Sequence, residues 1–101
     1  MWKVEYYKTA DNKEPVKEWL CSFDEKTKRK IQKHFLRLER KKLNLKHSFI
    51  NHLETQLYEI NVVEEKRVLK IIFFPSSYKK IMLLHAYSKN IAKNNKIKNA
   101  A

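Results

Sequence analysis

Glycine is absent from the 101-residue sequence, although it makes up about 7% of an average protein. Turns must therefore be built from Asn, Asp, Ser and Pro. The same absence excludes a glycine-rich phosphate-binding loop, which disfavours the common classes of nucleotide-binding enzyme. The single cysteine, Cys21, cannot form a disulfide within the chain, as is typical of a reducing compartment. We expect Cys21 to be a small core residue beside Trp19 and Leu20.

Long apolar runs and acidic residues are also scarce. No run approaches the roughly 20 residues that cross a bilayer, and the start MWKVEYY lacks the order of a signal peptide. We therefore expect a cytoplasmic protein with no membrane partner. The chain has 11 Asp and Glu against 23 Lys and Arg, a formal charge of +12. This surplus favours a polyanionic partner such as RNA, DNA or an acidic protein.

The sequence predicts a single domain over residues 1–101, of the α+β class. Strands are expected at Trp2 to Lys8, Leu57 to Val63, Arg67 to Phe74 and Lys79 to Tyr87, and helices at Lys13 to Leu20 and from about Asp24 to Lys42. We predict two N-terminal helices packed on one face of a small, mainly antiparallel four-stranded sheet, with the other face open. Asn44 to Gln56 is interpreted as a connection, and Ser88 to Ala101 as a basic, mobile or weakly helical tail.

The second predicted helix has two contrasting faces. Ile31, Phe35 and Leu38 recur at i, i+4 and i+7, which indicates a buried stripe. The opposite side is basic and contains Lys26, Lys30, Lys33, Arg37, Arg40 and Lys41. Such a face is usually only solvated, but here it joins a lysine-rich tail. Together they would bind many phosphates with little sequence preference, as on a large structured RNA.

Arg67 falls in line with core side chains. Because side chains alternate along a strand, it shares a face with Leu69, Ile71 and Phe73. It is either a strand-end arginine that extends its head group to water or part of a site. The residues alone leave both interpretations open.

His85 and Tyr87 share a face near the end of the last predicted strand, and Lys89 and Lys93 follow. Such a group could cleave a phosphodiester, since an imidazole or phenolate can take a 2′-hydroxyl proton and a lysine can stabilise the phosphorane charge. A half-buried histidine and a rim tyrosine are the alternative. The histidines show no spacing typical of a metal site, so no metal or cofactor is predicted.

Several short segments follow one another in a fixed order along most of the chain. They are WKVEYYKTADNKEPVKEWL, DEKTKRKI, NHLE before LYEI, RVL, and LLHAYSK followed by Lys93. This order resembles the RelE superfamily of bacterial toxins, in particular its HigB and phage-derived branch. The resemblance implies the toxin of a type II toxin-antitoxin pair that cleaves messenger RNA without metal, usually on the translating 70S ribosome. The 2′-hydroxyl would attack the adjacent phosphate and leave a cyclic phosphate.

The resemblance also implies residue roles and partners. By position, Arg67 would contact the scissile phosphate and Lys89 would be the basic residue after the last strand, with His85 and Tyr87 as proton-transfer candidates. The expected RNA-binding residues are Lys93, Lys26, Lys30, Lys33, Arg37 and Lys41. The expected partners are a cognate antitoxin protein, messenger RNA and the ribosome, with DNA reached only through the antitoxin.

The chain departs from the family pattern at Asn61, where relatives carry a basic side chain, and in the tail from Lys89 to Asn95. These departures are compatible with altered substrate choice, reduced activity or decay. The alternative function is a non-catalytic RNA- or ribosome-binding module, a toxin relative that has lost its chemistry. A DNA-binding regulator is disfavoured, because no helix-turn-helix pair is apparent.

Overall fold

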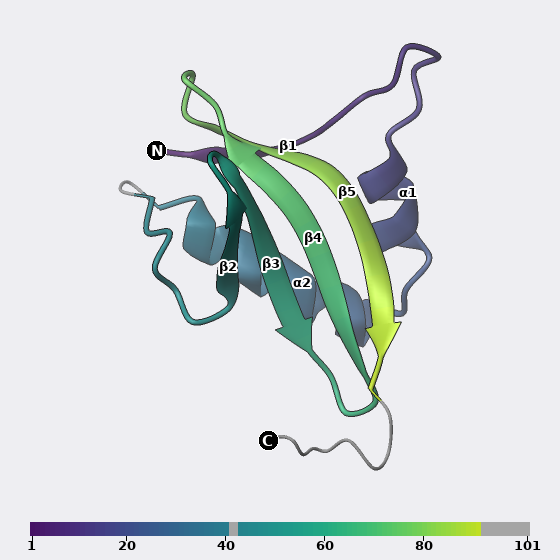
Figure 1. Cartoon of the computed structure of the whole chain (residues 1–101). Helices are drawn as coiled ribbons and strands as arrows, with labels where there is room; N and C mark the ends of the chain where they lie inside the picture. Colours follow the sequence, from purple (N-terminus) through teal and green to yellow (C-terminus); the bar gives the residue numbers. More distant parts are fainter. Residues whose placement is uncertain (41–42, 92–101) are drawn as a thin grey trace.

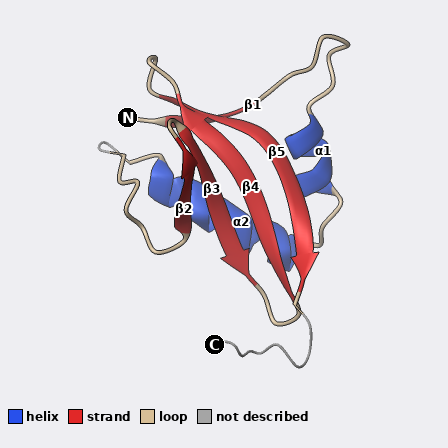
Figure 2. Cartoon of the chain, in the orientation of Figure 1, coloured by secondary structure: helices blue, strands red, loops and turns tan. Residues whose placement is uncertain are grey.

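The structure is a computed structural model that describes residues 1–40 and 43–91 (Figure 1). Its elements are β1 (Lys3–Tyr6), α1 (Pro15–Cys21), α2 (Glu25–Leu38), β2 (Ile50–Glu54), β3 (Leu57–Val63), β4 (Arg67–Pro75) and β5 (Lys80–Asn90). The strands form one sheet in the order β1-β5-β4-β3-β2. β1 runs parallel to β5, and the other neighbours are antiparallel. In the view of Figure 2, α2 crosses behind the sheet and α1 lies beside β5, at the right.

The predicted four-stranded sheet with two N-terminal helices is wrong. The sheet has five strands and is mixed, and both helices follow β1 in the chain. The missed strand is β2, in the segment interpreted as a connection. Only its first residue, Ile50, is buried, and its ladder to β3 is irregular between His52 and Glu54. A bulged edge strand with one buried side chain has no alternating pattern to detect.

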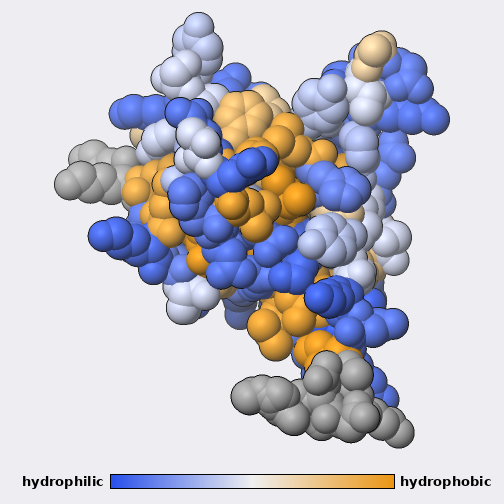
Figure 3. All heavy atoms as spheres, in the orientation of Figure 1, coloured by the Kyte–Doolittle hydropathy of each residue, from blue (hydrophilic) through white to orange (hydrophobic). Residues whose placement is uncertain are grey.

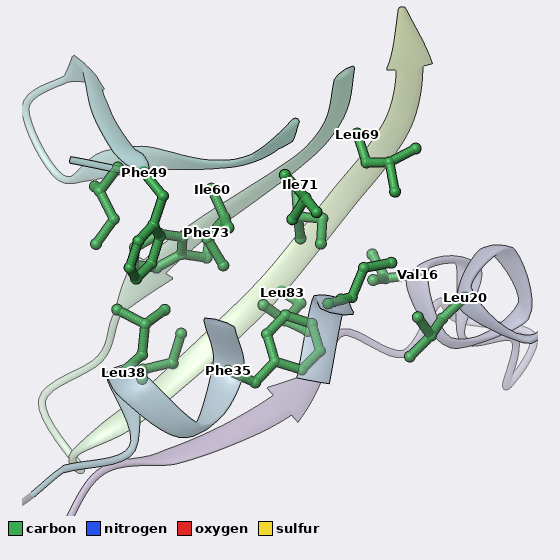
Figure 4. Packing of buried hydrophobic residues seen from close by; sticks show 14 residues of the cluster. Val16, Leu20, Phe35, Leu38, Phe49, Ile60, Leu69, Ile71, Phe73 and Leu83 are labelled. Carbon is green, nitrogen blue, oxygen red and sulfur yellow. The ribbon is translucent and has the colours of Figure 1, made fainter. Parts of the chain in front are cut away.

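The hydrophobic core fills the space between the helices and one face of the sheet (Figure 4). α1 contributes Val16 and Leu20, and the predicted stripe of α2, Ile31, Phe35 and Leu38, is confirmed as buried. The sheet contributes alternate residues, namely Ile60, Val62, Leu69, Ile71, Phe73, Ile81 and Leu83. Residues between these positions therefore project from the opposite face, which neither helix covers.

Several predicted boundaries shift. α2 begins after Asp24, whose Oδ1 accepts a hydrogen bond from the Thr27 amide at 2.9 Å, and it ends at Leu38 rather than near position 42. β5 continues to Asn90, so the first residues of the expected tail are strand. Cys21 is exposed and not in the core, because it ends α1 on the side away from the sheet-facing Val16 and Leu20. Within the described residues, no helix is long and apolar enough to cross a membrane.

Candidate functional site on the uncovered face of the sheet

A buried carboxylate lies on the face of the sheet that the helices leave uncovered. Glu59 is only 5% exposed. Its Oε1 lies 3.2 Å from Lys70 Nζ, and its Oε2 accepts a hydrogen bond of 3.4 Å from the Tyr87 hydroxyl. Lys70 Nζ also donates to Asn61 Oδ1 at 2.8 Å. We call Glu59, Asn61, Lys70, His85 and Tyr87 the open-face cluster. In Figure 3, hydrophilic side chains cross the centre of this face beside hydrophobic ones.

The strand register brings the open-face cluster together. Asn61 on β3, Lys70 on β4 and Tyr87 on β5 are direct cross-strand partners. Two residues further along β4, Ile72 pairs with Glu59 on β3 and with His85 on β5. The rings of His85 and Tyr87 lie 5.8 Å apart between centroids. Residues that are distant in the sequence thus place an ammonium, a carboxylate, a phenol and an imidazole in adjacent rows.

Arg67 lies on the other face. Its Nε donates to Glu64 Oε1 at 2.6 Å, and its guanidinium carbon lies 4.9 Å from the centre of the Phe23 ring. Glu64 Oε2 accepts from the Thr27 hydroxyl at 3.0 Å. The hydrogen bond from Arg67 holds the pKa of Glu64 below its ordinary value, and Thr27 adds to this effect. The turn between β3 and β4 is thereby tied to the start of α2.

A groove of about 500 Å³ opens beside this arginine. We call it the Arg67 groove; its lining residues are Lys26, Thr27, Lys30, Glu64, Glu65, Lys66 and Arg67. Four cations therefore face two carboxylates, and Glu64 already has a partner on each oxygen. Because one edge of the Arg67 guanidinium is held and one face is stacked on Phe23, the rest of the group is presented in a fixed orientation. The groove is suited to an anion.

The predicted site residues thus separate into two groups. His85, Tyr87 and Lys89 share the uncovered face, since their cross-strand partners Ile72, Lys70 and Val68 alternate with core residues of β4. Arg67 and the helix residues lie on the covered side, with Lys26 and Lys30 in the Arg67 groove and Lys33 and Arg37 further along α2. Lys41 and Lys93 lie outside the described residues. The roles proposed for all of these residues stay predictions.

Two members of the open-face cluster were missed from the sequence, Glu59 and Lys70. Lys70 interrupts an otherwise apolar strand on the face of Val68, Ile72 and Phe74. That interruption was the available signal, because a charge among half-buried side chains needs a partner. Its partner could not be named without the strand register, since Glu59 lies eleven residues away.

The other histidines have structural surroundings. His34 Nδ1 lies 2.9 Å from the Lys30 carbonyl and packs edge-on against Phe49. Burial lowers its pKa. His47 stacks on the same Phe49 ring, and His52 stacks on Tyr58. In residues 1–40 and 43–91, no group of three or more His, Cys, Asp or Glu side chains could hold a metal ion.

The chain matches a known protein family. Residues 18–100 match the family described as phage derived protein Gp49-like (DUF891). A comparison with curated proteins finds no match. The matched segment includes the end of α1, all of α2 and strands β2 to β5, and so covers both the open-face cluster and the Arg67 groove.

Proposed function

Because the chain belongs to the Gp49-like family of phage-derived proteins, a family associated with toxin-like proteins, we propose that it is a toxin that cleaves messenger RNA. The observation that supports this most is the open-face cluster, which combines a cation, two proton-transfer groups and a buried carboxylate on an accessible surface. These are the groups that metal-independent cleavage of RNA requires. The charge of +12 suits an RNA substrate.

In the proposed reaction, the imidazole of His85 removes the proton of a 2′-hydroxyl, and that oxygen attacks the adjacent phosphorus. The bond to the 5′ oxygen breaks as Tyr87 donates its proton, which leaves a 2′,3′-cyclic phosphate and a free 5′-hydroxyl. Lys70 stabilises the charge on the phosphorane oxygens. Glu59 is a positioning residue, since it holds both the Lys70 ammonium and the Tyr87 hydroxyl. Lys89, on the same face, extends the cationic surface along the strand.

Arg67 has a different place in this proposal. It lies across the sheet from Lys70, so a single phosphate cannot contact both side chains. An RNA strand that reaches the lysines of α2 must pass around the end of the sheet, where the Arg67 groove is located. We also propose contact with the ribosome and neutralisation by an acidic cognate antitoxin. Both rest on the resemblance to RelE-type toxins, and the cationic surface is compatible with both.

Primer extension on messenger RNA after induction of the protein tests the chemistry. We expect new 5′ ends within coding sequences and growth arrest. Replacing Lys70 by Met should lower the cleavage rate by about two to three orders of magnitude, as is usual for loss of one charge-stabilising group. The matched variant Lys80→Met removes a lysine of β5 on the same face of the sheet, which pairs with Glu5 at 2.8 Å, and it should cleave normally. Full cleavage by Lys70→Met would remove the cluster from the mechanism.

One observation favours a second function. The Lys70 ammonium already contacts Glu59 and Asn61, both within 3.2 Å, so its charge is largely neutralised before any RNA binds. A surface of this kind would bind RNA or ribosomes without cutting. In that case growth arrest would appear with no new 5′ ends, and the Lys70→Met variant would arrest growth as the parent does.

A further inference from the structure

α2 presents one large apolar side chain to solvent beside the edge of the sheet. Leu36 is 64% exposed, whereas its neighbour Phe35 is in the core. Both line a groove of about 340 Å³ between α2 and β1, together with Val4, Tyr6, Gln32 and Glu39. Core packing therefore does not explain a leucine at position 36, since its side chain lies outside the buried cluster.

Basic residues run along α2 on one side of this groove. Residues four, three and four positions apart lie along one stripe of a helix, and on α2 such a stripe joins Arg29, Lys33, Leu36 and, just beyond the helix, Arg40. All three cations are exposed. The carboxylate in the groove, Glu39, is already engaged, because its Oε2 accepts the Val4 amide at 2.7 Å. Leu36 thus lies in a row with three exposed cations, Arg29, Lys33 and Arg40, which we call the basic rim of the groove.

We propose that this groove receives an acidic amphipathic helix of a partner protein. An apolar side chain of that helix packs on Leu36 and Phe35, and its carboxylates pair with the basic rim. Two features select this occupant. A strand adding to β1 would have to displace Glu39 from the outward amide of Val4, and a second copy of this chain would bring a like charge of +12 against the same rim.

The inference specifies where the acidic partner of the proposed function binds, and it rests on that proposal for the partner's role. The surface itself is separate from the open-face cluster, which lies across the sheet. Its test contains no RNA. Failure of cleavage and failure of docking are therefore observed in different experiments.

The probe is a synthetic helix of about 18 residues with leucine on one face and glutamate on the other. Controls are the same peptide with lysine in place of glutamate, and a scrambled peptide of equal composition. Binding to the full chain is followed by amide chemical shifts in nuclear magnetic resonance spectra. We expect saturable binding of the glutamate peptide alone, with the largest shifts at Val4, Gln32 and Leu36.

Leu36→Ser tests the apolar contact and Lys33→Glu tests the charge pairing, with Leu53→Ser as the control. Leu36→Ser should weaken binding about tenfold or more, given the apolar area it removes. Leu53→Ser, at a leucine that is 45% exposed on the opposite edge strand, should bind as the parent does. Lys33→Glu should weaken the glutamate peptide and strengthen the lysine peptide. Equal binding by Leu36→Ser and the parent, equal binding of the scrambled peptide, or shifts centred elsewhere would overturn the proposal.

Discussion

Glu59 holds the side chains of the open-face cluster together on the uncovered face. A carboxylate that is 5% exposed is tolerated only when its oxygens are paired, and here Lys70 and Tyr87 provide the partners. The same contacts fix the position of both partners. The structural role of Glu59 and its proposed functional role therefore coincide, and stability measurements isolate the structural one.

Replacing Glu59 by Ala should lower the free energy of unfolding by about 2 to 3 kcal/mol, because the mostly buried Lys70 ammonium loses its counter-charge. Lys70→Met in the same background should restore part of that loss, which a double-mutant cycle from urea unfolding would measure. The control is Glu5→Ala, which breaks the exposed pair with Lys80 and should cost at most about 1 kcal/mol. An additive double variant would mean that Glu59 and Lys70 do not interact.

At the scale of elements, the sequence predicted what is periodic or strongly apolar. The buried stripe of α2 and the strands from Leu57 onward were predicted because their patterns repeat within the element. β2 was not, because it is a bulged edge strand with a single buried side chain. The pairing of β1 with β5 joins the first and last strands of the chain, and no local pattern specifies such a distant partner.

The candidate site was likewise predicted only where a local pattern specified it. The sequence placed Arg67 in line with core residues and His85 with Tyr87 on one face, and alternation along a strand was sufficient for both. It could not show that Arg67 and the two aromatic residues lie on opposite sides. That conclusion needs the register of β4 with β5 and the choice of which face the helices cover.

The β3–β4 turn is joined to α2 through Glu64, which leads to a pH-dependent prediction. The pKa of Glu64 is lowered from its ordinary value of 4.5, first by the Arg67 hydrogen bond. A lowered folded-state pKa contributes stability above the unfolded-state value of about 4.5, and this contribution is lost as the pH falls through the folded-state pKa. Glu64→Gln should therefore be less stable than the parent by about 1 kcal/mol at neutral pH.

That difference should shrink as the pH falls below about 4.5, as measured by urea unfolding across the acid range. Glu25→Gln is the matched control, because Glu25 pairs with Lys28 at 3.7 Å on the surface of α2, the helix to which Glu64 is bonded. It should show little loss at any pH. A Glu64→Gln deficit that stays constant from neutral to acid pH would show that the contact with Arg67 does not act through charge.

The whole molecule distributes its charge of +12 over both sides of the sheet. The uncovered face carries Lys70 and Lys89, and the covered side carries the basic residues of α2. The Arg67 groove is lined by the β3–β4 turn and the start of α2, and this turn lies at one end of the sheet (Figure 1). A strand of RNA could contact both sides only by passing this end, so the groove lysines should act as phosphate contacts rather than as catalysts.

Salt dependence of binding distinguishes these roles. For an uncleavable 2′-O-methyl RNA strand, each phosphate contact contributes about 0.7 to the slope of log affinity against log salt. Lys26→Ala combined with Lys30→Ala should reduce that slope by about 1.4, without changing the cleavage rate at saturating RNA. Lys8→Ala combined with Lys13→Ala removes the same charge from the exposed β1–α1 loop and should leave the slope nearly unchanged. If both pairs reduce the slope equally, the net charge of the molecule attracts RNA and the Arg67 groove has no special part in binding.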